Sequence, residues 1–92
     1  MGHMENIHNY IDKIAMEVFN FIKEEESKFE GGWVPAAHIK NALELNFVAV
    51  PKNNIQHGAK GWFFAIIARM LEDRDLVQYR KTDSRAYYRA KS

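Results

Sequence analysis

Cysteine is missing from all 92 residues, which excludes disulfide bonds, thiolate zinc sites and cysteine nucleophiles. Long apolar runs are also missing. The most apolar stretch, Gly61 to Leu71, is about half as long as a bilayer requires, and Arg69 interrupts it. A secretory signal would show a charged segment followed by an apolar one, and this pattern is not seen in the sequence. These absences predict a cytoplasmic protein with no membrane partner.

Residue patterns that would support catalysis are missing as well. The histidines at 8, 38 and 57 have no metal-ligand spacing, and no glycine-rich loop has the spacing that cradles a phosphate. Glu24, Glu25 and Glu26 are neighbours along the chain, which does not resemble a converging acid–base pair. We therefore expect no enzyme activity, no metal, no cofactor and no small-molecule substrate.

The chain does contain enough apolar material for one domain, because 47% of its residues are hydrophobic. The opening letters MGHM are typical of a cloning remnant, so residues 1–3 are set aside and residues 4–92 are treated as a single domain. Charge is divided unevenly within it. Residues 1–50 hold four Lys and Arg against eight Asp and Glu, whereas residues 51–92 hold nine against four. The basic half suggests either a polyanionic partner or solvated surface charge.

Apolar periodicity predicts three helices. The first extends from about Glu5 to Ser27. Its apolar stripe contains Ile7, Ile11, Ile14, Val18 and Ile22.

A short extended piece, Trp33–Val34, should follow Gly31-Gly32, and Pro35 suits the first turn of the second helix. The apolar side of that helix is predicted to contain Ala37, Ile39, Ala42, Leu43 and Leu45. Residues 46–53 then form a connection. The third helix should begin near Asn54 or Ala59 and continue to about Asp73.

On a helical wheel of the third helix, one face predicts the core: Ala59, Phe63, Ile66 and Met70, flanked by Trp62, Ile67 and Leu71. The opposite face holds His57, Lys60, Gly61, Phe64, Ala65 and Ala68, which are small or apolar for a surface in water. Three interpretations are open for that face. The second helix covers it, it approaches a nucleic acid closely, or Phe64, Ala65 and Ala68 form a surface for a protein partner or a second copy.

The C-terminal segments LVQYRK and AYYRA alternate like strands around the polar turn TDSR, which predicts a hairpin. Alternation puts Arg85, Tyr87 and Arg89 on one face of the second strand and Tyr88 on the other, in the core. Arg80 and Lys81 lie near the turn, so four cations are expected around this hairpin. An alternative role for edge cations is to block aggregation.

The order helix, short strand, helix, helix, hairpin resembles the winged helix-turn-helix superfamily. WVPAAHIKNAL is similar to its short strand and second helix, WFFAIIARMLEDRDLV to its third helix entering the hairpin, and YRKTDSRAYYRA to its wing. The resemblance implies an α+β domain that binds DNA or RNA or contacts other proteins. Residues 46–53 depart from the pattern, because they are longer than a tight helix-turn-helix turn.

The function expected from these patterns is non-enzymatic binding of double-stranded DNA, in gene regulation or as part of a larger system. Asn and Gln side chains pair with adenine edges, while Lys and Arg contact guanine or phosphate. The candidate DNA-contacting residues are Lys52, Asn53, Asn54, Gln56, His57, Lys60, Arg80, Lys81, Arg85 and Arg89. The alternative is a protein-interaction module that uses the outer surface of the third helix.

Overall fold

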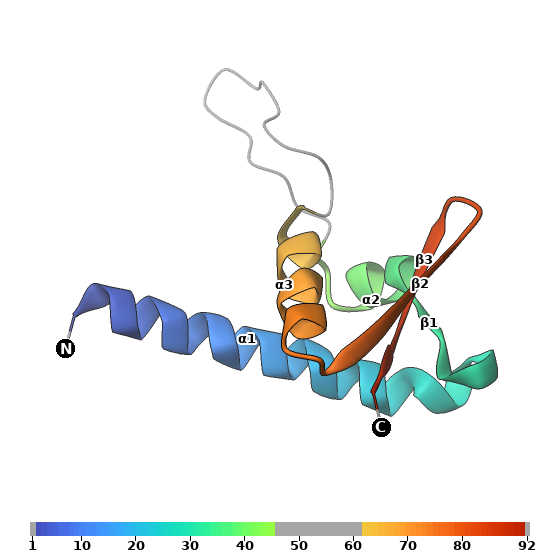
Figure 1. Cartoon of the computed structure of the whole chain (residues 1–92), viewed down its shortest axis with the longest axis horizontal. Helices are drawn as coiled ribbons and strands as arrows, with labels where there is room; N and C mark the ends of the chain where they lie inside the picture. The colour runs from blue at the N-terminus through green and yellow to red at the C-terminus, as the bar shows by residue number, and fades with distance from the viewer. Residues whose placement is uncertain (1, 46–61, 92) are drawn as a thin grey trace, which may run out of the picture.

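The computed structural model describes residues 2–45 and 62–91, which form three α-helices and a three-stranded antiparallel sheet (Figure 1). The fold class is therefore α+β, as the sequence predicts. The helices are α1 (His3–Glu25), α2 (Ala36–Ala42) and α3 (Trp62–Asp73), and the strands are β1 (Val34–Pro35), β2 (Val77–Thr82) and β3 (Arg85–Ala90). No helix within these two ranges is long and apolar enough to cross a membrane.

The limits of α1 differ slightly from the predicted ones. The helix begins at His3, within the segment expected to be a cloning remnant, and ends at Glu25. A short 3₁₀ helix, Glu26–Lys28, continues the chain to one residue beyond the predicted end at Ser27.

Only part of the predicted apolar stripe of α1 is covered. Val18 and Ile22 are buried, and Ile11 is half-buried against the core. Ile14 is 37% exposed and Ile7 is 54% exposed. Ile7 is exposed because the N-terminal turns of α1 project past the rest of the molecule (Figure 1). Ile14 lies next to the fully buried Ala15, at the margin of the buried side of the helix, where it lines a hollow with Leu43 and Leu45.

Pro35 belongs to β1 and not, as predicted, to the first turn of a helix. Its φ of −63° and ψ of 138° are extended, and α2 begins one residue later, at Ala36. Pro35 pairs with Tyr87 at the edge of the sheet, where a residue without an N–H group is tolerated.

Helix α2 buries a narrower side than its sequence predicts. Ile39 is fully buried, and Leu43 and Leu45 are half-buried against the core, as expected. Ala37 and Ala42 are exposed instead. With only seven residues, α2 presents about two turns, so only one narrow side reaches the sheet and α1.

The predicted core face of α3 is wrong by about one residue. Phe64, Ile67, Ala68 and Leu71 are buried, whereas Ile66 is 53% exposed. Trp62 is also exposed, and Phe63 and Met70 are half-buried. Residues 62–68 are apolar throughout, so their periodicity does not select one face.

The contact that selects the face of α3 comes from the sheet. The ring of Phe64 packs edge-on against Tyr88 of β3, with the ring centroids 5.5 Å apart. The proposed partner surface of Phe64, Ala65 and Ala68 does not exist in this arrangement, because only Ala65 is exposed.

The predicted hairpin is confirmed. Strands β2 and β3 pair from Val77↔Ala90 to Thr82↔Arg85, which leaves a connection of two residues in place of the four expected. Asp83 takes a left-handed φ of 57° there, a conformation that aspartate tolerates better than most residues.

The short strand β1 joins β3 on its other side, so β3 is the central strand of a sheet with the order β1-β3-β2. One side of this sheet contributes Val34, Val77 and Tyr88 to the core. The assignment of Tyr88 to the core is thus confirmed. Burial raises the pKa of its phenol to about 12.

Two substitutions on α3 distinguish the observed core face from the predicted one. Phe64→Ala should lower the free energy of unfolding by about 3–5 kcal/mol, because it removes a buried ring. Ile66→Ala should change it by less than about 1 kcal/mol, because that side chain is mostly in solvent. Urea unfolding monitored by far-UV circular dichroism measures both. The reverse order of effects would contradict the register of α3.

Candidate functional site

The sheet has a second side, which we call the outer face. Alternation along paired strands puts six side chains on it. They are Gln78, Arg80, Thr82, Arg85, Tyr87 and Arg89. Three of them are cations, and all three were candidates from the sequence.

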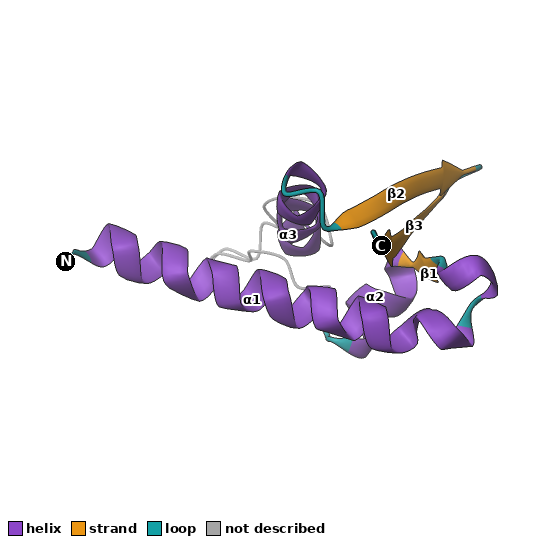
Figure 2. Cartoon of the chain, turned by 60° about the horizontal axis from the view of Figure 1, so that its bottom comes forward, coloured by secondary structure: helices purple, strands orange, loops and turns teal. Residues whose placement is uncertain are grey.

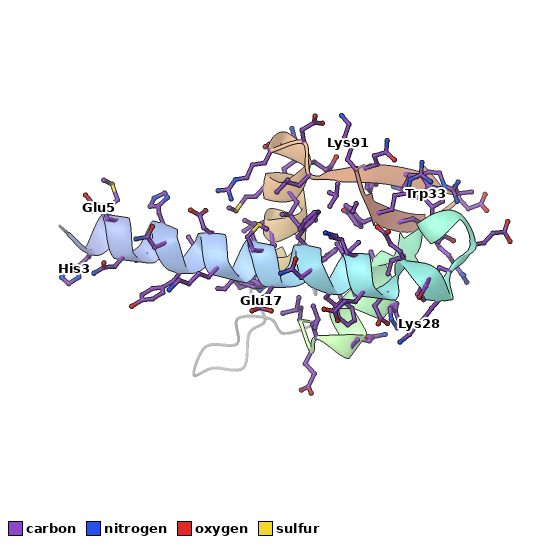
Figure 3. All side chains as sticks on the ribbon, turned by 90° about the horizontal axis from the view of Figure 1, so that it is seen from below. His3, Glu5, Glu17, Lys28, Trp33 and Lys91 are labelled. Carbon is purple, nitrogen blue, oxygen red and sulfur yellow. The ribbon has the colours of Figure 1, made fainter. Side chains whose placement is uncertain are left out.

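Trp33, just before β1, lies against this outer face (Figure 3). The guanidinium carbon of Arg89 is 4.2 Å from its ring centroid and that of Arg80 is 4.6 Å away. The Arg80 guanidinium also lies 5.5 Å from the ring of Tyr87. Cations over aromatic rings in this range are attracted to the ring faces. Trp33 therefore holds both arginines of neighbouring strands.

Gly31 helps to set the position of Trp33. Its φ of 66° is left-handed, and an added Cβ would lie 3.1 Å from Cδ1 of the indole. A side chain at residue 31 would therefore be strained and would displace the ring. Gly31, which the sequence indicates only as part of the break after the first helix, is therefore needed for this approach.

Arg89 is fixed by contacts within the chain. Its Nε donates a hydrogen bond to Oε1 of Gln78 at 2.7 Å, and its NH1 group donates one to the carbonyl oxygen of Gly31 at 2.9 Å. Together with the Trp33 contact, these bonds join β3, β2 and the turn before β1. Arg89 therefore has the geometry of a positioning residue.

Arg80 and Arg85 differ from Arg89 in their polar contacts. Both are exposed, and within residues 2–45 and 62–91 neither forms an ion pair. The guanidinium of Arg80 lies near two aromatic rings, while Arg85 lies beside the hairpin turn. Their charges are available to an anionic partner.

Lys81 does not belong to this group. It pairs with Ala86, so alternation puts it on the opposite side of the sheet from Arg80 and Arg85. The four cations expected around the hairpin are therefore divided between its two sides. The other six candidates, Lys52, Asn53, Asn54, Gln56, His57 and Lys60, lie outside the described residues.

Two hollows flank the outer face. One, of about 410 Å³, is lined by aromatic, cationic and acidic residues: Phe29, Glu30, Gly31, Trp33, Pro35, Arg80 and Tyr87. The negative charge of the Glu30 carboxylate would repel an anion that enters this hollow deeply.

The other hollow, of about 460 Å³, lies between the start of α2 and the hairpin turn, and both Lys40 and Arg85 line it. Lys40 was not a candidate, because its position beside Arg85 depends on pairing between segments more than 40 residues apart. Trp33 was not a candidate either, because its contacts with Arg80 and Arg89 depend on the pairing of β1 with the distant β3.

Glu25 is the buried charged residue among those that the structure describes. Its carboxylate lies 2.7 Å from Nε2 of His38 and 3.0 Å from Nζ of Lys28. The hydrogen bond with His38, then that with Lys28, lowers the pKa of Glu25. The contact between Glu25 and His38 joins α1 to α2. Within the two described ranges, no three His, Cys, Asp or Glu side chains are placed to hold a metal ion.

Comparison of the chain with protein-family models, with curated proteins and with solved structures found no match.

Arg89 and Arg80 should respond differently to truncation. Arg89→Ala should lower the free energy of unfolding by about 1–3 kcal/mol, because it breaks two hydrogen bonds that involve a charged donor. Arg80→Ala should lower it by less than about 1 kcal/mol, since it loses only exposed ring contacts. Equal losses in urea unfolding would show that Arg89 is not the fixed arginine of the pair.

Proposed function

We propose that this chain is a winged helix-turn-helix domain that binds double-stranded DNA through the outer face of its hairpin and catalyses no reaction. It would act in gene regulation or as the DNA-contacting module of a larger system. The observation that carries the proposal is the pair of exposed arginines, Arg80 and Arg85, which share one face and lack carboxylate partners among the described residues.

The topology supports the winged assignment. A helix, a short strand, two further helices and a hairpin follow one another, and the short strand pairs with the second strand of the hairpin. In this assignment β2 and β3 are the wing.

The chemistry of Arg80 suits a phosphate group. A guanidinium is planar and can donate to two phosphate oxygens at once, and aromatic rings nearby attract its charge. Since Trp33 and Tyr87 already restrict this side chain, little further rotamer entropy is lost on binding. Arg80 is thus proposed as a backbone contact.

Arg85 occupies a different position, next to the turn, where a long side chain extends furthest from the sheet. We assign it a contact with phosphate or with the minor groove, where negative potential is concentrated. Lys40, across the second hollow, would neutralise a neighbouring phosphate. Arg89 holds Trp33 in place and makes no DNA contact in this proposal.

Preference for particular DNA base sequences would come from residues outside the hairpin. Asn54 and Gln56 remain the proposed base readers, with Lys52 and Lys60 as further backbone contacts, on the strength of the sequence alone. The protein-interaction alternative has lost the surface on α3 that suggested it, because Phe64 and Ala68 are buried.

Salt dependence tests the proposal. Arg80, Arg85 and Lys40 would neutralise about three phosphates, so the log–log slope of affinity against salt should be about −3 or steeper. Arg85→Ala should weaken binding to all duplexes similarly and flatten the slope by about one unit. Fluorescence anisotropy with a labelled random-sequence duplex at several salt concentrations gives both values.

Lys13→Ala is the matched control. It removes the same charge from an exposed position on α1, about 180° around the helix from the buried Ile22, and should leave affinity and slope unchanged. Failure to bind any duplex at low salt with micromolar protein would refute the proposal. So would a slope that Arg80→Ala and Arg85→Ala leave unaltered.

A further inference from the structure

The hollow of about 410 Å³ beside Trp33 is large enough for a small ligand, because such sites commonly measure about 300–1,000 Å³. Three kinds of wall enclose it: rings, one guanidinium and one carboxylate. The rings are those of Phe29, Trp33, Pro35 and Tyr87. The guanidinium belongs to Arg80 and the carboxylate to Glu30. An occupant has to suit all three kinds of wall.

Contacts within the chain hold the ring walls in place. Phe29 packs edge-on against His38, with the ring centroids 5.0 Å apart. Trp33 has two guanidinium carbons at 4.2 Å and 4.6 Å from its ring centroid. Tyr87 is paired with Pro35 across neighbouring strands. These walls are therefore formed before a ligand arrives, which lowers the entropy lost on binding.

The two charged walls exclude several classes of ligand. The positive charge of Arg80 repels a lysine or arginine side chain, and the negative charge of Glu30 repels an anion that enters deeply. Glu30 is exposed and forms no ion pair within the described part of the chain, so its carboxylate oxygens can accept hydrogen bonds from a ligand. The suitable ligand is neutral and planar, with N–H donors on one edge and a negative group attached elsewhere. A nucleobase with its phosphate has these features.

Given the DNA binding proposed above, on which this assignment rests, we propose that the hollow binds one unpaired nucleobase of the bound DNA. The base packs against the ring walls, as bases commonly do in single-strand sites. Glu30 accepts hydrogen bonds from the edge of the base, and the phosphate of the same nucleotide contacts Arg80. The base has to be unpaired, because a complementary base would occupy the edge that Glu30 contacts.

Glu30 also makes the hollow selective among the four bases. The pairing edge of guanine carries two neighbouring donors, N1–H and the N2 amino group, which match the two oxygens of a carboxylate. Adenine and cytosine each present one amino group there. Thymine presents one N–H between two carbonyl oxygens, and a carboxylate repels these oxygens. Guanine should therefore bind most tightly and thymine least tightly.

Fluorescence anisotropy with one duplex in several forms tests this assignment. The forms are blunt, or carry one unpaired guanine or thymine at the 3′ or the 5′ end. At one of the two ends, the guanine form should bind about tenfold more tightly than the blunt form, and the thymine form should bind like the blunt one. Glu30→Gln should abolish the difference between guanine and thymine, because an amide offers one donor and one acceptor and suits both bases.

Glu17→Gln is the matched control. It removes the same charge from an exposed position on α1 that lines a different hollow, away from Trp33 (Figure 3). This variant should keep the preference for guanine. Equal binding of the blunt, guanine and thymine forms overturns the base site and leaves DNA binding by the outer face intact. Failure to bind any form refutes the DNA binding itself.

Free guanosine monophosphate distinguishes a DNA strand from a soluble nucleotide as the source of the base. In a Trp62→Phe variant, Trp33 is the one remaining tryptophan, so its fluorescence reports on the hollow. Guanosine monophosphate should quench it only weakly, because the free nucleotide lacks the contacts of the duplex with the outer face. A free nucleotide that binds as tightly as the guanine duplex would overturn DNA as the source.

Discussion

Alternation along β3 is the constraint on which the rest of the structure depends. As the central strand, β3 is paired on both sides, so its side chains can only point to the core or to the outer face. Tyr88 takes the core side, where it meets Phe64 of α3, and Arg89 takes the other. A slip of one residue would bury a guanidinium and expose the tyrosine, so burial fixes the register strongly.

The ends of α1 and β3 are joined by side chains that complete this arrangement. Strand β1 pairs only at Val34 and Pro35, so it does not reach the N–H group of Ala90. A carboxylate oxygen of Glu26 accepts that N–H at 2.6 Å in its place. Arg89 then links the adjacent turn to the sheet through Gly31. The sheet is therefore attached to the residues that follow α1, and Arg89 of the outer face is held in a fixed position.

Much of this could be predicted from the sequence, because the signals are local. The helix of residues 5–27, the hairpin and the burial of Tyr88 follow from periodicity and turn chemistry alone. The register of α3 could not be predicted, since WFFAIIA is apolar at every position and only contact with Tyr88 distinguishes Phe64 from Phe63. Arg80 and Arg89 look equivalent in sequence. Their difference depends on Gln78, Gly31 and Trp33, which only the folded sheet brings together.

The most direct test of this account is to follow the arginine side chains by NMR of their Nε–Hε groups while duplex DNA is added. Before addition, the Arg89 signal should be protected from exchange with water, and those of Arg80 and Arg85 should exchange rapidly. On addition, the signals of Arg80 and Arg85 should shift and slow their exchange, while Arg89 changes little. An Arg89 signal that exchanges freely and shifts with the other two would contradict the division between a positioning arginine and DNA-contacting ones.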